Sequence, residues 1–253
     1  MHFHVPKPLH GWREFVGEVG IIVLGVLIAL AAEQAVESWH WHEKIDDAER
    51  AMRLELADDN GPQAYGRILI GPCLDAQLAR IHDGAGNVDA AQLRKWTAEY
   101  MPPFRSWDSE AWKTVLGSEV GSHMGSDRLV RWSSPYRVIN DMTAANKQER
   151  DLATDLREAI PPRGDPSPEQ LQTLRRLAAQ LRTYNSGMFR GSQLLLARSG
   201  SLGAPVPTAK RQQLLIAARQ MYGGCARLPD LKIVPLAGLL RGNLRLQPIQ
   251  NGM

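Results

Sequence analysis

The sequence predicts an all-α protein in which one N-terminal transmembrane helix continues into a stalk, followed by an α-helical bundle of about five to six helices. Residues 16–36 form the most apolar run in the chain. Apolar side chains recur every three or four residues through much of the remainder, which is the period of one helix face. No segment shows the regular alternation of apolar and polar residues that is typical of a half-buried strand.

The apolar run is long enough to cross a bilayer. Residues 19–32 carry no charged or polar side chain, and the flanking turns extend the run to residues 16–36, about the 20 residues that span the hydrocarbon layer. Trp12 and Trp39 lie 27 positions apart, or about 40 Å of helix, which matches a bilayer with its interfacial layers. We therefore predict that Trp12, Trp39 and the nearby Trp41 lie at the membrane interfaces.

The same run allows two other interpretations. Ala29-Leu30-Ala31 has the small-x-small pattern of a signal-peptide cleavage site, and a helix buried in a protein core would also be apolar. We favour a retained span because the helical pattern continues past Ala32. Glu14 and Glu18 also dilute the positive charge that begins a signal peptide.

Flanking charge indicates the orientation of the span. Arg13 lies at its border, whereas Lys44, Arg50 and Arg53 follow it at a greater distance. Positive charge next to a span favours the cytoplasmic side. We therefore expect a cytoplasmic N-terminus and a main domain on the far side of the membrane.

Within the span, Gly25 and Ala29 form a small-x-x-x-small pair. Small residues four positions apart let two helices approach closely in a membrane. The pair is a candidate helix–helix contact, and it makes self-association a hypothesis.

The stalk is expected to be one amphipathic helix. Its apolar face has spacings of three and four residues and consists of Trp41, Ile45, Ala48, Met52 and Leu56. Asn60-Gly61-Pro62 then predicts a helix end, because glycine and proline are strong stop signals.

Turn signals divide the chain into seven segments. These are a short tip (1–15), the transmembrane helix (16–36), the juxtamembrane helix (37–60), the first part of the helical domain (61–160), a linker (161–166), a helical hairpin (167–222) and an extended tail over the bundle (223–253).

Local signals predict the helices of residues 61–160. The first begins near Pro62, is kinked or broken by Gly71-Pro72 and closes at residues 82–87. Asp89 is a suitable cap for a short helix that ends near Tyr100. The remaining expectations are a short helix opened by Asp108 or Ser109, a flexible loop over residues 117–126, and a long helix from Asp127 to Ile160 that Pro135 bends near its start.

The helical hairpin has clear boundaries. Ser167 is the predicted cap of a helix with Pro168 at its first position, a favoured arrangement. A shorter helix is predicted from Thr208 to Tyr222, where Gly223-Gly224 ends it.

Charge is distributed unevenly along the chain. The net charge is −6 in residues 1–60, −1 in residues 61–160 and +10 in residues 161–253. A basic segment can bind nucleic acid or lipid headgroups. We favour packing of this segment along the acidic juxtamembrane helix of the same chain or a neighbour, because its basic residues are spread at helical intervals. Nucleic acid is the less favoured partner.

The two cysteines, Cys73 and Cys225, fit no metal-ligand spacing. In a compartment outside the cytoplasm they could form a disulfide. Two separate buried thiols are the other interpretation, and the sequence does not choose between them.

The search for an active site finds no catalytic motif. Phosphate-binding loops, dinucleotide fingerprints, nucleophile elbows and zinc-protease motifs are absent from the sequence. His40 and His42 are two positions apart, so they point away from each other on a helix. We predict no catalytic, cofactor-binding or metal-binding residues. The tryptophans of the middle segment could line a ligand pocket, although core packing is favoured: Trp96, Trp107, Trp112 and Trp132.

The segment from Gly17 to Leu30, together with Trp39 and the acidic helix ending at residues 54–60, resembles a family of uncharacterised bacterial single-span membrane proteins. That family has a short cytoplasmic tip, a G-E-x-x-I-V-x-G-V-L-I-A-L-type span and a helical domain. The resemblance covers roughly the first 60 residues. It implies a bacterial inner membrane with a periplasmic domain, and it carries over no activity and no functional residues.

These observations favour a non-enzymatic scaffold or interaction module at the inner membrane. Its expected partners are the lipid bilayer and either another protein or a second copy of the chain. The alternative is a ligand-sensing bundle that binds a small molecule near the middle tryptophans. A third and weaker hypothesis is an enzyme that uses histidine and aspartate residues of the loops.

Overall fold

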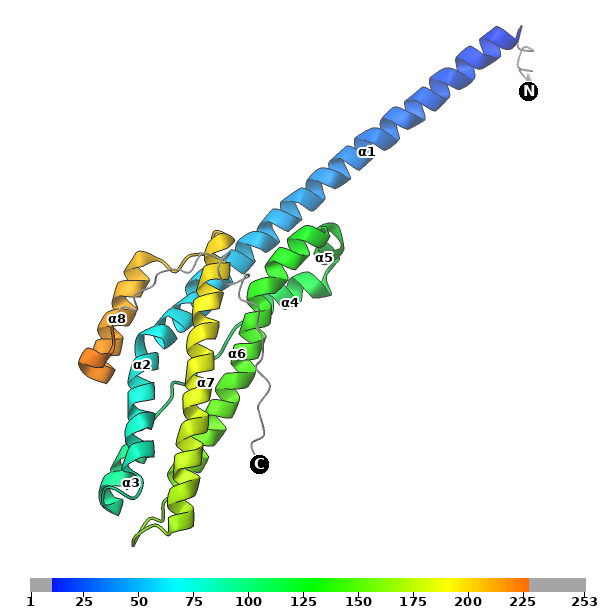
Figure 1. Ribbon diagram of the computed structural model, residues 1–253. Coiled ribbons are helices and arrows are strands. Elements are labelled where there is room, and N and C mark those ends of the chain that lie inside the picture. The colour runs from blue at the N-terminus through cyan, green and yellow to red at the C-terminus, as the bar shows by residue number, and fades with distance from the viewer. Residues whose placement is uncertain (1–10, 228–253) are drawn as a thin grey trace, which may run out of the picture.

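The computed structural model describes residues 11–227, and within this range it is all-α, as predicted (Figure 1). One long straight helix leads from the N-terminal side into a bundle of helices that lie roughly side by side. No strand occurs between residues 11 and 227. The first ten residues of the predicted tip, and the predicted tail from residue 228 on, lie outside the described residues.

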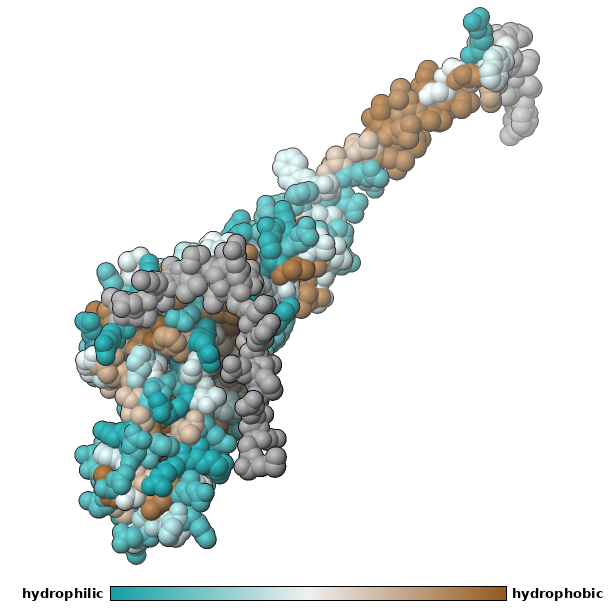
Figure 2. Space-filling model, in the orientation of Figure 1, coloured by the Kyte–Doolittle hydropathy of each residue, from teal (hydrophilic) through white to brown (hydrophobic). Residues whose placement is uncertain are grey.

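Helix α1 (Trp12–Leu54) contains the apolar run. The most apolar 18-residue window of this continuous helix has a mean hydropathy of 2.5, and none of it is buried. In Figure 2 this window is the brown, hydrophobic stretch of the long helix that projects from the bundle. By length and composition, it is the one helix of residues 11–227 that could span a membrane.

The lower part of α1, from about residue 41 to its end at Leu54, packs in the bundle and is not a separate stalk. The predicted apolar face is confirmed, since Ile45, Met52 and Leu56 are buried and Ala48 is partly buried. This face packs against α4 (Glu110–Gly117) and α5 (Glu119–His123), and it shares a hydrophobic cluster with residues of α6 (Ser126–Glu158), whose Tyr136 hydroxyl lies 3.5 Å from the Met52 carbonyl oxygen. The predicted loop over residues 117–126 therefore contains a short helix, α5.

The predicted helix end at Asn60-Gly61-Pro62 is wrong. A π-helical turn, η1 (Glu55–Asn60), joins α1 directly to α2 (Gly61–Gly84). Pro62 lies in the first turn of α2, where a proline is tolerated. At Gly61, a Cβ would lie 2.7 Å from both the Leu56 carbonyl oxygen and a Val206 methyl carbon, so glycine permits close packing here.

Asn60 is held by a tertiary contact at this junction. Its amide nitrogen donates to the Asp108 carbonyl oxygen at 2.9 Å, and its amide oxygen accepts from the Asp108 backbone N–H at 2.9 Å. These reciprocal bonds attach the segment before α4 to the π-helical turn.

Helix α2 continues through Gly71-Pro72 without a break. The side-chain amide of Asn185, on α7 (Pro168–Ser201), donates to the Gly71 carbonyl oxygen at 2.9 Å. The Phe189 ring lies where a Cβ of residue 71 would be. Glycine at position 71 therefore allows α7 to approach α2 closely.

The other helix boundaries agree with the local signals. Asp89 caps α3 (Ala90–Glu99) by accepting from the Gln92 N–H. Ser167 and Gln170 form a capping box at the start of α7. Helix α8 spans Thr208–Tyr222, and α6 contains Pro135 without interruption. The short 3₁₀ turn η2 (Gly223–Cys225) follows α8.

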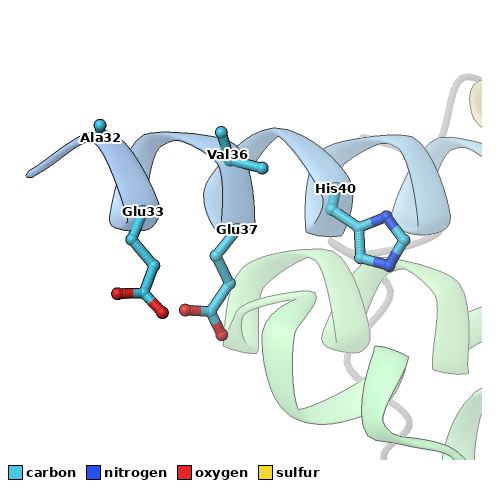
Figure 3. Close-up of a pocket in the computed structure, with 5 residues that line it drawn as sticks. All are labelled: Ala32, Glu33, Val36, Glu37 and His40. Atoms are coloured by element: carbon cyan, nitrogen blue, oxygen red, sulfur yellow. The ribbon is translucent and has the colours of Figure 1, made fainter. Parts of the chain in front are cut away.

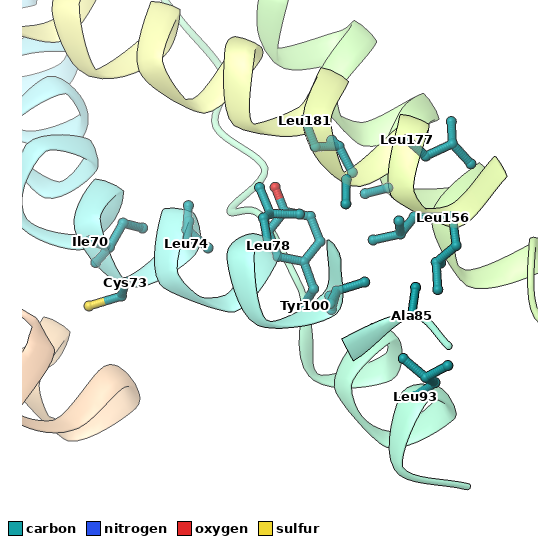
Figure 4. Close-up of a cluster of buried hydrophobic side chains, with 14 of the residues drawn as sticks. Ile70, Cys73, Leu74, Leu78, Ala85, Leu93, Tyr100, Leu156, Leu177 and Leu181 are labelled. Carbon is teal, nitrogen blue, oxygen red and sulfur yellow. The ribbon is translucent and has the colours of Figure 1, made fainter. Parts of the chain in front are cut away.

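Two hydrophobic clusters stabilise the bundle. One is formed mainly by α2, α3, α6 and α7, with Leu74, Leu78 and Leu181 fully buried (Figure 4). The other is built from the lower part of α1 together with α4, α6 and α7. Burial of a leucine side chain contributes roughly 1.5–3 kcal/mol. The two clusters therefore stabilise the domain, whereas the exposed part of α1 buries no side chains that could do so.

Candidate functional site

The surface where α1 leaves its apolar part is the first candidate site. Ala32, Glu33, Val36, Glu37 and His40 line a shallow open hollow on one side of the helix (Figure 3). The Glu33 and Glu37 carboxylates point to the same side because the residues are four positions apart. Like charges at this spacing disfavour the helix slightly. A cationic group on a partner would relieve that repulsion.

A second hollow lies where α1 meets α5. The rings of Trp41 and His123 stack with centroids 3.6 Å apart and an interplanar angle of 6°. The Lys44 ammonium nitrogen is 4.6 Å from the Trp41 ring centroid. Glu37, Met124 and Arg128 also line this hollow. Trp41 follows Val36 by five positions, or about 8 Å of helix, so α5 lies close to the level at which the apolar run ends.

The three tryptophans predicted to lie at the membrane interfaces differ in their exposure. Trp12 and Trp39 are 78% and 76% exposed at the two ends of the run. Trp41 is half-buried against α5. Its membrane contact remains a prediction, and its contact with His123 was not foreseen because nothing in the sequence links the two residues.

Gly25 and Ala29 lie on the exposed part of α1. A Cβ at Gly25 would meet nothing within 4 Å. The small pair is therefore available to a second helix, and the predicted helix–helix contact stays a prediction.

The histidines near the end of the span are not brought together. His42 Nδ1 lies 2.6 Å from the Ser38 carbonyl oxygen, one turn earlier on the same helix. His40 lines the first hollow, whereas His42 and His123 both line the second. Among the described residues no three histidine, cysteine or acidic side chains form a group that could hold a metal ion.

The middle tryptophans do not surround one pocket. Trp107 and Trp132 are buried in the cluster beside α1, and Trp112 stacks on Tyr136 with centroids 5.4 Å apart. Trp96 packs against the other cluster, with the Arg80 guanidinium 4.7 Å from its ring centroid. This placement agrees with core packing, and both hollows described above lie elsewhere.

The structure joins Cys73 and Cys225 in a disulfide, with their Cα atoms 5.5 Å apart. Cys73 is buried on α2, whereas Cys225 is exposed in η2. The bond attaches the end of α8 to α2. This matters because Ala218 is the one residue of α8 that is buried.

The described part of the basic segment, residues 161–227, forms no ion pair with the acidic juxtamembrane helix of the same chain, and its remainder lies outside the described residues. Arg182 on α7 pairs with Asp75 on α2 at 2.9 Å. Arg53 instead donates to the Leu202 carbonyl oxygen at 3.1 Å. Pairing with a neighbouring chain stays a hypothesis.

A buried ion pair inside the bundle was missed by sequence reasoning. Arg67 on α2 and Glu149 on α6 are almost fully buried. The Arg67 Nη1 and Nη2 atoms donate to the two Glu149 carboxylate oxygens at 2.9 and 2.5 Å. Asn185 on α7 accepts from Nη2 at 2.9 Å. One signal was present, since Arg67 interrupts the apolar positions 65–70. Glu149 gave none.

Comparisons of the chain with protein-family models, with curated proteins and with solved structures found no match. The resemblance of the first 60 residues to an uncharacterised bacterial family therefore stays an expectation. The class that the fold itself defines is an all-α protein with one helix that could span a membrane.

Proposed function

We propose that this chain is a single-span protein of the bacterial inner membrane that holds a non-enzymatic helical interaction domain in the periplasm. The observation that carries the proposal is the uninterrupted helix from Phe15 to Gly84. Its first part is apolar and fully exposed, whereas its last part is the centre of the bundle. A continuous helix of this kind would hold the domain in a fixed position relative to the membrane. This role requires no catalytic residues.

The disulfide supports the periplasmic placement. Disulfides persist in oxidising compartments and are rare in the cytosol. The Cys73–Cys225 bond therefore agrees with the orientation that Arg13 favours.

Topology is tested by thiol labelling of intact spheroplasts with a membrane-impermeant reagent. We expect labelling of the exposed Cys225 only after reduction, and labelling of the buried Cys73 only once the reduced chain is also unfolded. As a matched control, Lys7→Cys in a chain with both native cysteines changed to serine should be labelled only after lysis. Labelling of the native cysteines only after lysis, with no effect of the reductant, would contradict the proposed placement.

Partner binding is tested by crosslinking in native membranes from photoreactive residues at positions 33 and 37. We expect one stoichiometric protein partner, or a dimer of the chain. A dimer through the span should be weakened by Gly25→Leu, whereas Gly20→Leu, on a different side of the helix, is the control. If every crosslinked species persists in Gly25→Leu, Gly25 is not part of the contact.

A further inference from the structure

The buried ion pair is part of a larger polar group in the bundle. Its second guanidinium is Arg105, in the segment between α3 and α4. Arg105 lies against Gly66, where a Cβ would be 2.9 Å from the Arg105 Nη2 atom. Gly66 therefore leaves the space that lets Arg105 approach α2 beside Arg67. Two guanidinium groups and one carboxylate, that of Glu149, meet in this region.

Arg105 is held in place by Asn146 on α6. The backbone N–H of Arg105 donates to the Asn146 amide oxygen at 3.1 Å, and the Asn146 amide nitrogen donates to the Pro103 carbonyl oxygen at 3.3 Å. Among the described residues no carboxylate forms an ion pair with Arg105. Burial, and then the charge of Arg67, lower the pKa of Arg105. Its positive charge is thus uncompensated within the described chain.

Three buried hydrogen-bond donors of this group are unused. They are Arg67 Nε, Arg105 Nε and the Tyr100 hydroxyl, none of which has a hydrogen-bond partner among the described residues. Tyr100 is fully buried, and its hydroxyl lies within the electrostatic influence of Glu149 and Arg67. Figure 4 shows the Tyr100 ring among the leucines of α2 and α7. Buried donors are normally satisfied, so three in one group indicate a missing acceptor.

We propose that Arg67, Arg105 and Tyr100 form a binding site for a small oxyanion, namely the carboxylate or phosphate group of a small molecule. Such a group accepts several hydrogen bonds, and its negative charge would pair with the Arg105 guanidinium, which has no carboxylate partner among the described residues. Guanidinium groups match the planar geometry of a carboxylate and the oxygens of a phosphate. A bound water would satisfy the donors but would leave the charge unpaired.

Arg105 is the partly exposed member of the group, whereas Arg67 and Tyr100 are buried. Met101 and Phe104 of the same segment are exposed. Tyr222, at the end of α8, is half-buried and lies next to this segment, with its hydroxyl 3.5 Å from the Met101 carbonyl oxygen. Arg105 is therefore the member of the group that an oxyanion from solvent would meet first.

The test is thermal unfolding of the purified full chain in detergent. Sodium phosphate and sodium acetate are each compared with sodium chloride at equal ionic strength. We expect a Tm that rises with the concentration of phosphate or acetate, because a ligand that binds only the folded state stabilises it. The preferred group is the anion whose rise depends on Arg105, because phosphate also stabilises folded proteins without binding a specific site. No rise above the chloride reference in either arm would overturn the proposal.

Two variants locate the effect. Arg105→Gln should abolish the rise, whereas Arg190→Gln, which removes an exposed guanidinium from α7, should retain it. Tyr100→Phe removes one donor and keeps the ring, so we expect the half-maximal anion concentration to increase about tenfold. This variant also decides the matter if Arg105→Gln does not fold. An unchanged anion response in Arg105→Gln, or in Tyr100→Phe, would contradict the assigned site.

Discussion

The pair of Arg67 and Glu149 shows how charge is retained inside a helical bundle. Both side chains are withdrawn from water, which costs several kcal/mol per ion unless each finds good partners. Two hydrogen bonds join them, and Asn185 provides a third for Arg67. The pair fixes α2, α6 and α7 relative to each other, because residues on all three helices must meet at one point.

Removing one partner of this pair should strongly destabilise the domain. Glu149→Gln keeps the shape of the side chain but leaves Arg67 charged and buried, which costs about 3–5 kcal/mol. Urea unfolding of the full chain in detergent, followed by tryptophan fluorescence, measures the free energy of unfolding. The control is Asp75→Asn, which breaks the exposed pair with Arg182 and should cost less than about 1 kcal/mol. Similar losses in both variants would contradict the special role of the buried pair.

Two buried tyrosines predict a loss of stability at high pH. Burial, and then the nearby Glu149, raise the pKa of Tyr100; burial, and then Glu55, raise the pKa of Tyr136. Above about pH 10 the unfolded chain releases these protons while the folded chain keeps them. Stability should therefore fall as pH rises past this value, by about 1.4 kcal/mol per pH unit for each tyrosine.

This pH dependence is measured by urea unfolding between pH 9 and pH 11. Tyr136→Phe should reduce the slope of stability against pH above pH 10, because one of the two protons is no longer released. A slope equal to that of the unchanged chain would show that Tyr136 does not contribute.

At the scale of elements, α8 depends on its covalent attachment. It has one buried residue, Ala218, and three of its residues are partly buried against the first cluster: Leu214, Leu215 and Tyr222. The disulfide that follows it joins residues 152 positions apart. A crosslink over so long a loop removes much conformational freedom from the unfolded chain.

Breaking this disulfide should lower the free energy of unfolding by up to about 5 kcal/mol, from the loop length. The comparison is between the oxidised chain, the reduced chain and a variant with Cys73→Ser and Cys225→Ser. Hydrogen exchange should also become faster in α8 and remain slow in α7. If the double variant still responded to the reductant, the effect would not come from this bond.

The junction of α1 and α2 shows where element prediction fails. Glycine and proline at positions 61 and 62 are ordinary stop signals, yet the helix continues. The π-helical turn absorbs the change of direction, and the reciprocal hydrogen bonds of Asn60 with Asp108 hold it. Residue 108 lies 48 positions away, so no local window of sequence contains this contact.

At the scale of the whole molecule, the exposed part of α1 does not contribute to the stability of the bundle, although the same helix continues into it. Residues 15–40 are exposed throughout, whereas Ile45, Met52 and Leu56 belong to the core. The boundary between the exposed apolar part and the domain part therefore lies within α1 near residue 41. If the apolar part spans a membrane as proposed, a helix without a break at this boundary keeps the domain at a fixed distance from that membrane.

Truncation tests this division. A chain that lacks residues 1–36 should be soluble and should keep its Tm within a few degrees, because residues 15–36 are exposed and bury nothing in the domain. A chain that lacks residues 1–56 should not fold cooperatively, since it loses three core side chains. Circular dichroism during heating measures both. A large decrease of Tm in the shorter deletion would show that the span supports the bundle.

The sequence by itself determined the all-α class, the one apolar helix and most helix boundaries. Asp89, Ser167 and the glycines after Tyr222 act through neighbours within a few residues, so local chemistry suffices to place those helix ends. The tertiary structure alone decided the continuation through Pro62, the stacking of Trp41 on His123, the joining of Cys73 to Cys225, and the meeting of Arg67 with Glu149 and Asn185. Each of these depends on residues far apart in the chain, which only the packing of helices brings into contact.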